Sequence, residues 1–223
     1  MIDRKDLLIF SFIVLAFFAA CSVSLGPEAE DKKYYVLESD HAGLVKFGQP
    51  LEQNLRVRET EAGRFVNSQR IIFSKNDRSR GYYQFAYWVD PPPKRIGMLL
   101  ESYLERVGIF SAVFRESSGV PADFELRTEI LDFRHHIASS PGEVVVSINA
   151  ELVSLVDREI VAKKNFTVSK DVADFNAEGA IEAFSLASNE VLSLISTWVG
   201  SQFSRTSLPS RAQGLLIETD QKL

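Results

Sequence analysis

The sequence contains a single cysteine, Cys21, among its 223 residues. One cysteine excludes an intramolecular disulfide framework and a zinc site built from several thiolates. Net charge is also small, with a formal value of -5 at pH 7 and an isoelectric point near 5.4. Because nucleic-acid binding depends on clustered lysine and arginine, this mildly acidic chain gives no electrostatic reason to expect a nucleic-acid partner.

The sequence also lacks the short motifs of common enzyme classes. It has no Gly-x-Ser-x-Gly nucleophile elbow, no glycine-rich phosphate loop and no His-Glu-x-x-His zinc motif. Glu101 and Glu105 lie one turn apart on the polar face of a predicted helix, which is typical of a solvated surface rather than of a general acid and base. We therefore expect a protein that is not an enzyme, has no catalytic residues and needs no cofactor.

The adjacent histidines His135 and His136 are the best candidates for a metal site. With Asp132 nearby, a weak metal site is conceivable, and a periplasmic hydrolase or metal enzyme is the corresponding functional alternative. Zinc sites require three or four converging ligands, however, and neighbouring side chains on a strand face opposite ways. The surrounding sequence, HHIASSPG, is rich in turn-forming residues, so we interpret the two histidines as a solvated loop pair that binds no metal.

The first 20 residues are organised like a secretory signal. Arg4 and Lys5 precede an apolar run, residues 7–20, whose one polar residue is Ser11. This run is shorter than the ~20 residues of a membrane span, and it ends in small side chains, as a cleavable signal peptide does. Without modification at Cys21, the segment would act as an ordinary signal peptide or as an uncleaved anchor.

The tripeptide Ala-Ala-Cys that ends at Cys21 resembles the lipobox of bacterial lipoproteins, although Phe18 stands where leucine is usual. The resemblance implies cleavage before Cys21 and attachment of diacylglycerol and an N-acyl chain, such as palmitate, to that residue. Two acyl chains suffice for stable anchoring, because each buried methylene contributes ~0.8 kcal/mol. Since Ser22 differs from the aspartate that resembles an inner-membrane retention signal, the periplasmic side of the outer membrane is favoured.

Composition divides the chain into four parts. We expect a signal peptide over residues 1–20 and a flexible tether over residues 21–33, which is polar and has little to bury. Residues 34–200 have the length of one domain with one core. Residues 201–223 lose the amphipathic rhythm and are predicted to form a mobile tail.

Two segments of the predicted domain have the helical period. One follows Asp90, a good N-cap, carries prolines in its first turn and ends at Gly108. The other begins after Asp174 and extends to about Val199. Both apolar stripes are explained most simply as faces that cover a sheet.

Most of the remaining domain alternates with period two, which predicts β-strands. The last three strands, over residues 122–133, 143–157 and 159–169, are predicted to form an antiparallel meander. Shorter strands are expected at residues 34–38, 55–58, 70–74, 82–88 and 110–115. We therefore predict an α+β two-layer sandwich, with a mostly antiparallel sheet covered by two amphipathic helices.

The predicted strand YYQFAYW is unusually aromatic. Alternation places Tyr83, Phe85 and Tyr87 on one face, and Tyr82 and Trp88 on the other. A strand buried on one side would still present aromatic rings outward, and such rings are enriched at interfaces. We consider Tyr83, Phe85, Tyr87 and Trp88 a candidate partner or ligand surface; packing of both faces in the core is the alternative.

The segment KNDRSR, residues 75–80, is a short basic stretch between two predicted strands. Its charge would allow contact with lipid headgroups or with an acidic partner. A charged hairpin loop without a partner is the alternative.

The order of these segments resembles the ABC-type transport auxiliary lipoproteins, the PqiC-like group. The likeness runs from about Tyr34 to Trp198, and its most specific part is the aromatic strand in which Trp88 leads through a proline into the helix. The family often has arginine before that tryptophan, where Tyr87 stands here.

The resemblance implies a non-enzymatic auxiliary component of a lipid transport system in the cell envelope. Its partners would be an Mce-type periplasmic protein, an ABC permease and the ATPase of the same system, together with membrane lipid through the anchor. The resemblance also makes a homo-oligomer possible. The alternative is a structural or assembly lipoprotein of another outer-membrane complex, which would have the same anchor and a domain of the same size.

Overall fold

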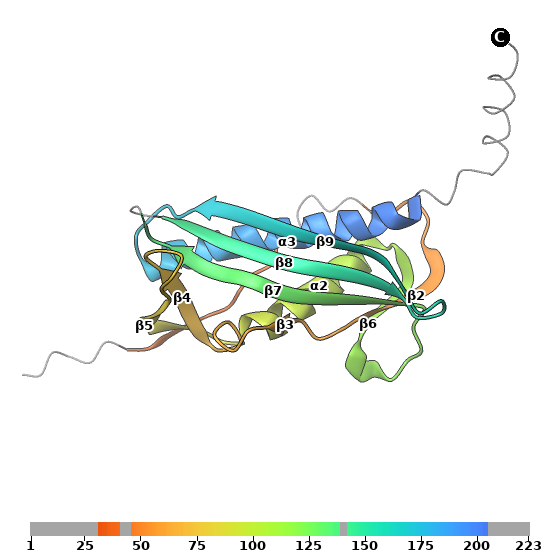
Figure 1. The fold of residues 1–223 in the computed structure, drawn as a ribbon, viewed down its shortest axis with the longest axis horizontal. Coiled ribbons are helices and arrows are strands. Elements are labelled where there is room, and N and C mark those ends of the chain that lie inside the picture. Colours follow the sequence, from red (N-terminus) through yellow and green to blue (C-terminus); the bar gives the residue numbers. More distant parts are fainter. Residues whose placement is uncertain (1–30, 41–45, 139–141, 205–223) are drawn as a thin grey trace, which may run out of the picture. The chain divides into compact units, whose positions relative to one another are not determined.

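The computed structural model describes residues 31–40, 46–138 and 142–204. The predicted signal peptide, Cys21 and most of the tether lie outside these residues, as does the chain from residue 205 onward. Within the described residues, one mixed β-sheet is accompanied by two long helices (Figure 1). The predicted α+β class is confirmed.

The described elements follow the predicted order of strands, helix, strands and helix. Two of the predicted strands, at residues 70–74 and 110–115, have the predicted bounds, and the others differ at one or both ends. In chain order the elements are β1 (Lys33–Tyr35), β2 (Leu51–Val57), β3 (Glu61–Ala62), β4 (Arg70–Ser74), β5 (Gly81–Trp88), α2 (Pro92–Val107), β6 (Phe110–Arg115), the short 3-10 helix η1 (Glu116–Ser118), β7 (Phe124–His136), β8 (Glu143–Ser154), β9 (Glu159–Asp171) and α3 (Ala177–Ser204).

The long strands β7, β8 and β9 form the predicted antiparallel meander, and β4 pairs antiparallel with β5. The other pairings are parallel: β1 with β5, β2 with β6 and β7, and both β3 and β4 with β7. Parallel neighbours need a crossover connection, and α2 supplies one between the N-terminal strands and β6. The sheet is therefore more mixed than alternation alone predicted.

Helix α2 is not capped by Asp90, so the predicted N-cap was wrong. The N-cap is Pro91, which makes no side-chain capping bond, and the helix begins at Pro92, whose missing N–H would have had no partner in the first turn. Asp90 instead pairs with Lys94, one turn into the helix, at 2.7 Å. Gly108 ends the helix as predicted, with a left-handed φ of 70°.

Both helices cover the same face of the sheet, because α3 packs on β8 and β9 while α2 packs on β2, β6, β7 and α3 (Figure 1). On this face β8 buries alternate residues from Val144 to Leu152, as its period-two pattern predicted. Half-buried side chains alternate with them on the opposite face. Within the described part of the chain, helices therefore cover the meander on one side only.

Helix α3 continues to Ser204, five residues beyond its predicted end. The extension has a packing reason, since the ring of Phe203 contacts Phe110 at 5.2 Å and Phe124 at 5.0 Å between centroids. The first residues of the predicted tail are thus helical, and the rest of that tail lies outside the described residues.

Candidate functional site

Strand β5 contributes one of its candidate side chains to the core. Trp88 is only 2% exposed, and its ring makes edge contacts with Phe133 at 6.0 Å and with Phe184 at 5.4 Å. The ring lies between the sheet and α3, so it presents no surface to a partner. This corrects the placement of Trp88 in the candidate partner surface.

Tyr83 is half-buried. Its hydroxyl lies 2.7 Å from Nδ1 of His135, and its ring meets that of Phe73 edge-on at 5.7 Å. Burial raises the pKa of Tyr83 to about 12. Phe85 and Tyr87 are partly exposed. A role for Tyr83, Phe85 and Tyr87 in binding stays a prediction.

The alternation predicted for β5 is interrupted. Arg70 of β4 lies opposite Tyr87, but Ile72, two residues on, lies opposite Tyr82, so β5 carries extra residues at a register shift. As a result Tyr82 and Tyr87 both lie against the guanidinium of Arg70, at 4.9 Å and 5.5 Å from the ring centroids. The prediction that these two tyrosines occupy opposite faces was wrong, because it assumed an unbroken strand.

Further aromatic rings and a second cation contact the two tyrosines that flank Arg70. Tyr34 of β1 stacks on Tyr87 with centroids 5.5 Å apart, and Lys32 lies 5.7 Å from the same ring. Phe65 stacks on Tyr82 at 4.3 Å. We call this set the aromatic–cation surface; its members are Lys32, Tyr34, Phe65, Arg70, Tyr82 and Tyr87.

The aromatic–cation surface is accessible. Tyr34 is 58% exposed and Phe65 is 39% exposed, which is high for large rings that already have stacking partners. The set draws on β1, on the segment before β4, on β4 and on β5, so residues distant in sequence meet only in the fold. Of these members, the candidate surface predicted from sequence contained Tyr87 alone; no sequence pattern grouped the others with it.

The two histidines lie in β7 rather than in a loop, so the solvated-loop interpretation was wrong. β7 extends to His136 because it pairs there with both β4 and β8. His135 is fully buried beside Tyr83, whereas Nδ1 of His136 lies 3.0 Å from the hydroxyl of Ser74. Across residues 31–40, 46–138 and 142–204, no group of three or more His, Cys, Asp or Glu side chains could hold a metal ion.

A row of alternating charges crosses the face of the sheet that the helices leave open. Glu125 of β7 is 3% exposed and accepts hydrogen bonds from Arg56 of β2 at 2.6 Å and from Arg127 at 2.7 Å. Burial alone would raise the pKa of Glu125, but the two arginines outweigh it and hold that pKa below its usual value. Arg127 continues the row to Glu151 on β8, and Glu151 continues it to Lys163 on β9.

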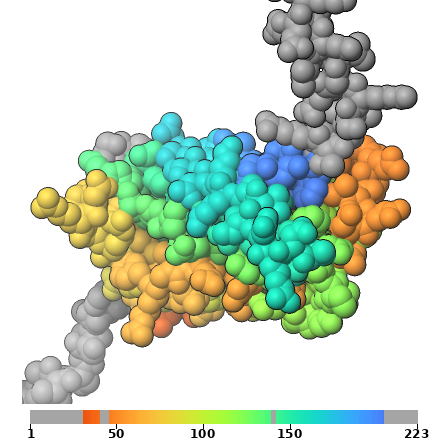
Figure 2. All heavy atoms as spheres, turned by 45° about the vertical axis from the view of Figure 1, so that its right-hand side comes forward, coloured from red at the N-terminus to blue at the C-terminus, as the bar shows by residue number. Residues whose placement is uncertain are grey.

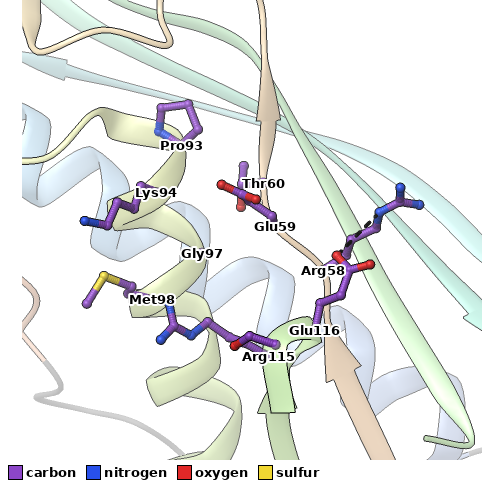
Figure 3. Close-up of a pocket in the computed structure, with 10 residues that line it drawn as sticks. Arg58, Glu59, Thr60, Pro93, Lys94, Gly97, Met98, Arg115 and Glu116 are labelled. Atoms are coloured by element: carbon purple, nitrogen blue, oxygen red, sulfur yellow. Dashed lines mark ion pairs between the residues drawn. The ribbon is translucent and has the colours of Figure 1, made fainter. Parts of the chain in front are cut away.

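A pocket of about 390 Å³ lies between α2 and the segment that follows β2 (Figure 3). Its lining includes Arg58 and Glu116, which pair at 4.0 Å, and Arg115, which pairs with Glu101 at 3.0 Å. Gly97 brings α2 close to this segment, since a Cβ there would lie 3.3 Å from Oγ1 of Thr60.

The cations that line the pocket are already partnered. Lys94 pairs with Asp90, as Arg58 and Arg115 pair with glutamates. The pocket therefore offers no concentrated charge to an anionic substrate, and we assign it no reaction.

None of the helices in the described part of the chain is long and apolar enough to cross a membrane.

Comparison with known proteins gives one family match. A family model described as "ABC-type transport auxiliary lipoprotein component" matches residues 35–196. A search of curated proteins returns no significant match.

Among solved structures, protein XCC0632 from Xanthomonas campestris, described with the family DUF330, is similar over 78% of this chain and 99% of its own, with 21% identity and a TM-score of 0.70. An uncharacterized protein is similar over 76% of this chain and 99% of its own, with 14% identity and a TM-score of 0.60. At these identities the two structures establish a shared fold.

Proposed function

The chain belongs to the ABC-type transport auxiliary lipoprotein family, and from this membership we propose that it is a non-enzymatic auxiliary component of an Mce-linked lipid transport system of the cell envelope. The observation that carries the proposal is the family match, which spans most of the folded domain. Transport energy would come from the ATPase of the system, so this chain would need no phosphate loop of its own.

The site geometry supports a role in contact rather than in chemistry. The buried polar side chains of the candidate site are engaged with one another, as Tyr83 is with His135 and Glu125 is with two arginines. Among the described residues, the aromatic–cation surface is accessible for contact. In the proposed role the domain contacts an Mce-type protein and the ABC permease, alone or as a homo-oligomer.

Cys21 supplies the anchor in this proposal. Acylated at Cys21, the protein would be held on the periplasmic side of the outer membrane by its tether. Changing Cys21→Ser removes the acyl acceptor, so we expect the protein to leave the outer-membrane fraction or to remain as an uncleaved precursor. Fractionation of envelopes and immunoblotting measure this; unchanged fractionation with full processing would exclude the lipid anchor.

The variant Ser22→Asp tests whether the protein is sorted to the outer or to the inner membrane. It keeps Cys21 and its acylation but creates the sequence that resembles an inner-membrane retention signal. We expect the variant to shift to the inner membrane while the wild-type chain stays in the outer one. Identical distribution of the two proteins would contradict the proposed sorting.

Transport itself is tested by genetic epistasis. If the protein works only with its ABC system, deleting its gene and deleting the ATPase gene should increase outer-membrane permeability to the same extent. Deleting both genes should increase permeability no further. Additive defects would favour the alternative, a structural lipoprotein of another outer-membrane complex.

A further inference from the structure

Positive charge is concentrated at one part of this acidic chain. The whole chain has a formal net charge of -5, yet the segment from Gly63 to Gly81 carries five basic residues and a single acidic one, Asp77. All five basic residues are exposed; they are Arg64, Arg70, Lys75, Arg78 and Arg80. The segment contains Phe65 and Arg70 of the aromatic–cation surface and runs into the β4–β5 loop.

The chain enters the domain beside this basic segment. β1 begins at Lys33, which lies opposite Ala86 of β5 and parallel to it. Lys33 is held in place by Glu178 of α3, at 2.9 Å. In Figure 1, β4 and β5 lie at the end of the sheet away from β2 and β6, and in Figure 2 the yellow segment that contains the β4–β5 loop projects at the left.

The tether predicted from the sequence would limit how far this end of the domain can move from a membrane anchor. Residues 22–32 separate Cys21 from β1. A flexible segment of that length has a root-mean-square span of about 18 Å and a fully extended reach of about 40 Å. If Cys21 is acylated, the first strand and its neighbours stay close to the lipid headgroups.

The chemistry of the aromatic–cation surface matches such a location. Tyrosine is enriched where a membrane meets water, because its ring is apolar and its hydroxyl is polar. Lysine and arginine beside those rings attract anionic headgroups. Tyr34 and Phe65 offer exposed rings, and Arg70 lies between Tyr82 and Tyr87.

We propose that the aromatic–cation surface, together with the basic β4–β5 loop, binds the anionic phospholipid headgroups of the membrane that holds the anchor. This inference rests on the proposed acylation of Cys21. It adds a second contact, made by the folded domain itself, which would orient the domain on the membrane instead of leaving it free on its tether.

The test uses the chain without its signal peptide and with Cys21→Ser, so that no acyl chain contributes. Its partition is measured by co-sedimentation with vesicles of phosphatidylethanolamine and phosphatidylglycerol, and with vesicles of phosphatidylcholine alone. We expect binding to the anionic vesicles, weaker binding to phosphatidylcholine and loss of binding at high salt.

Two substitutions and two matched controls locate the contact. Arg70→Glu should weaken partition into anionic vesicles by at least about fivefold, since each basic residue near an anionic surface contributes about that factor. Its control is Lys164→Glu, which removes an exposed cation that also lies over an aromatic ring, on β9. Tyr34→Ser should weaken partition too, whereas Ile160→Ser, at a residue 60% exposed on β9, should not.

Absence of vesicle binding, or equal effects of Arg70→Glu and Lys164→Glu, would overturn the inference. It would also be overturned if Arg70→Glu released a protein subunit from the complex while vesicle partition stayed unchanged, since the surface would then bind protein. Because the tested chain carries no lipid, failure here leaves the fractionation result for Cys21 intact, so the two proposals fail separately.

Discussion

At the scale of single residues, the two histidines considered as metal ligands and the buried Glu125 all have structural contacts. His135 is buried against Tyr83, His136 contacts Ser74, and Glu125 is neutralised by the arginines beside it. Sequence spacing could not reveal these contacts because each joins residues more than 50 positions apart, with the exception of Glu125 and Arg127. Of the aromatic residues of β5, Trp88 is buried and Tyr82, Tyr83, Phe85 and Tyr87 are partly buried, which alternation alone did not predict.

The variant Trp88→Ala tests whether the Trp88 side chain of β5 belongs to the core. Trp88→Ala removes a buried ring that contacts Phe133 and Phe184, so we expect a loss of about 3–5 kcal/mol in the free energy of unfolding. Denaturant unfolding followed by circular dichroism measures the change. Tyr87→Ala, at a partly exposed residue of the same strand, is the control and should cost much less; equal losses would mean that Trp88 is not the buried member.

Glu125 should make stability depend on pH. Its pKa in the folded protein lies below the unfolded value of about 4.3, so its contribution is complete above that pH and is lost as the pH falls through the folded pKa. Glu125→Gln leaves Arg56 and Arg127 without their buried anion, and we expect a loss of about 1.5–3 kcal/mol near pH 7.

The pH dependence of stability distinguishes the loss of the charged carboxylate in Glu125→Gln from a simple packing defect. The difference in unfolding free energy between wild type and Glu125→Gln should shrink below about pH 4, as the wild-type carboxylate is protonated too. A difference that stays constant from pH 7 to pH 3 would contradict the electrostatic explanation.

At the scale of elements, local patterns predicted which segments form strands and helices but not how the strands pair. The strands at residues 70–74 and 110–115 and the end of α2 at Gly108 were predicted from alternation, helical period and turn chemistry. The parallel pairings along β7 were not, because period two is the same for both strand directions. The register shift between β4 and β5 was not predicted either, because it depends on how the two strands pair and not on the sequence of one strand.

The turn between β7 and β8 depends on Gly142. This residue has φ of 89°, and a Cβ there would collide with the carbonyl oxygen of His136. Gly142→Ala should therefore destabilise the hairpin by more than the ~1 kcal/mol expected for left-handed strain alone. Gly108→Ala is the matched control, because Gly108 has φ of 70° but open space around its Cα.

Thermal unfolding of the two glycine variants measures the difference. We expect a clearly lower Tm for Gly142→Ala than for Gly108→Ala, since both share the strain and only the first adds the collision. Equal Tm values would show that crowding at the hairpin is unimportant.

At the scale of the whole molecule, the chain combines a predicted lipid anchor and a predicted tether with the α+β fold of a family of transport auxiliary lipoproteins. Its charge is unevenly distributed, with basic residues near the point where the chain enters the domain and an overall negative charge. This distribution suits the proposed contact with anionic lipid at the end where the chain enters the domain.

The central claim is that this anchored domain works as a subunit of an Mce-linked transport system. Native mass spectrometry of the full-length protein, crosslinked in envelopes and extracted gently, tests it most directly. We predict a triacylated chain beginning at Cys21 in a defined complex with Mce-type or permease subunits. An unlipidated monomer without those subunits would contradict the claim.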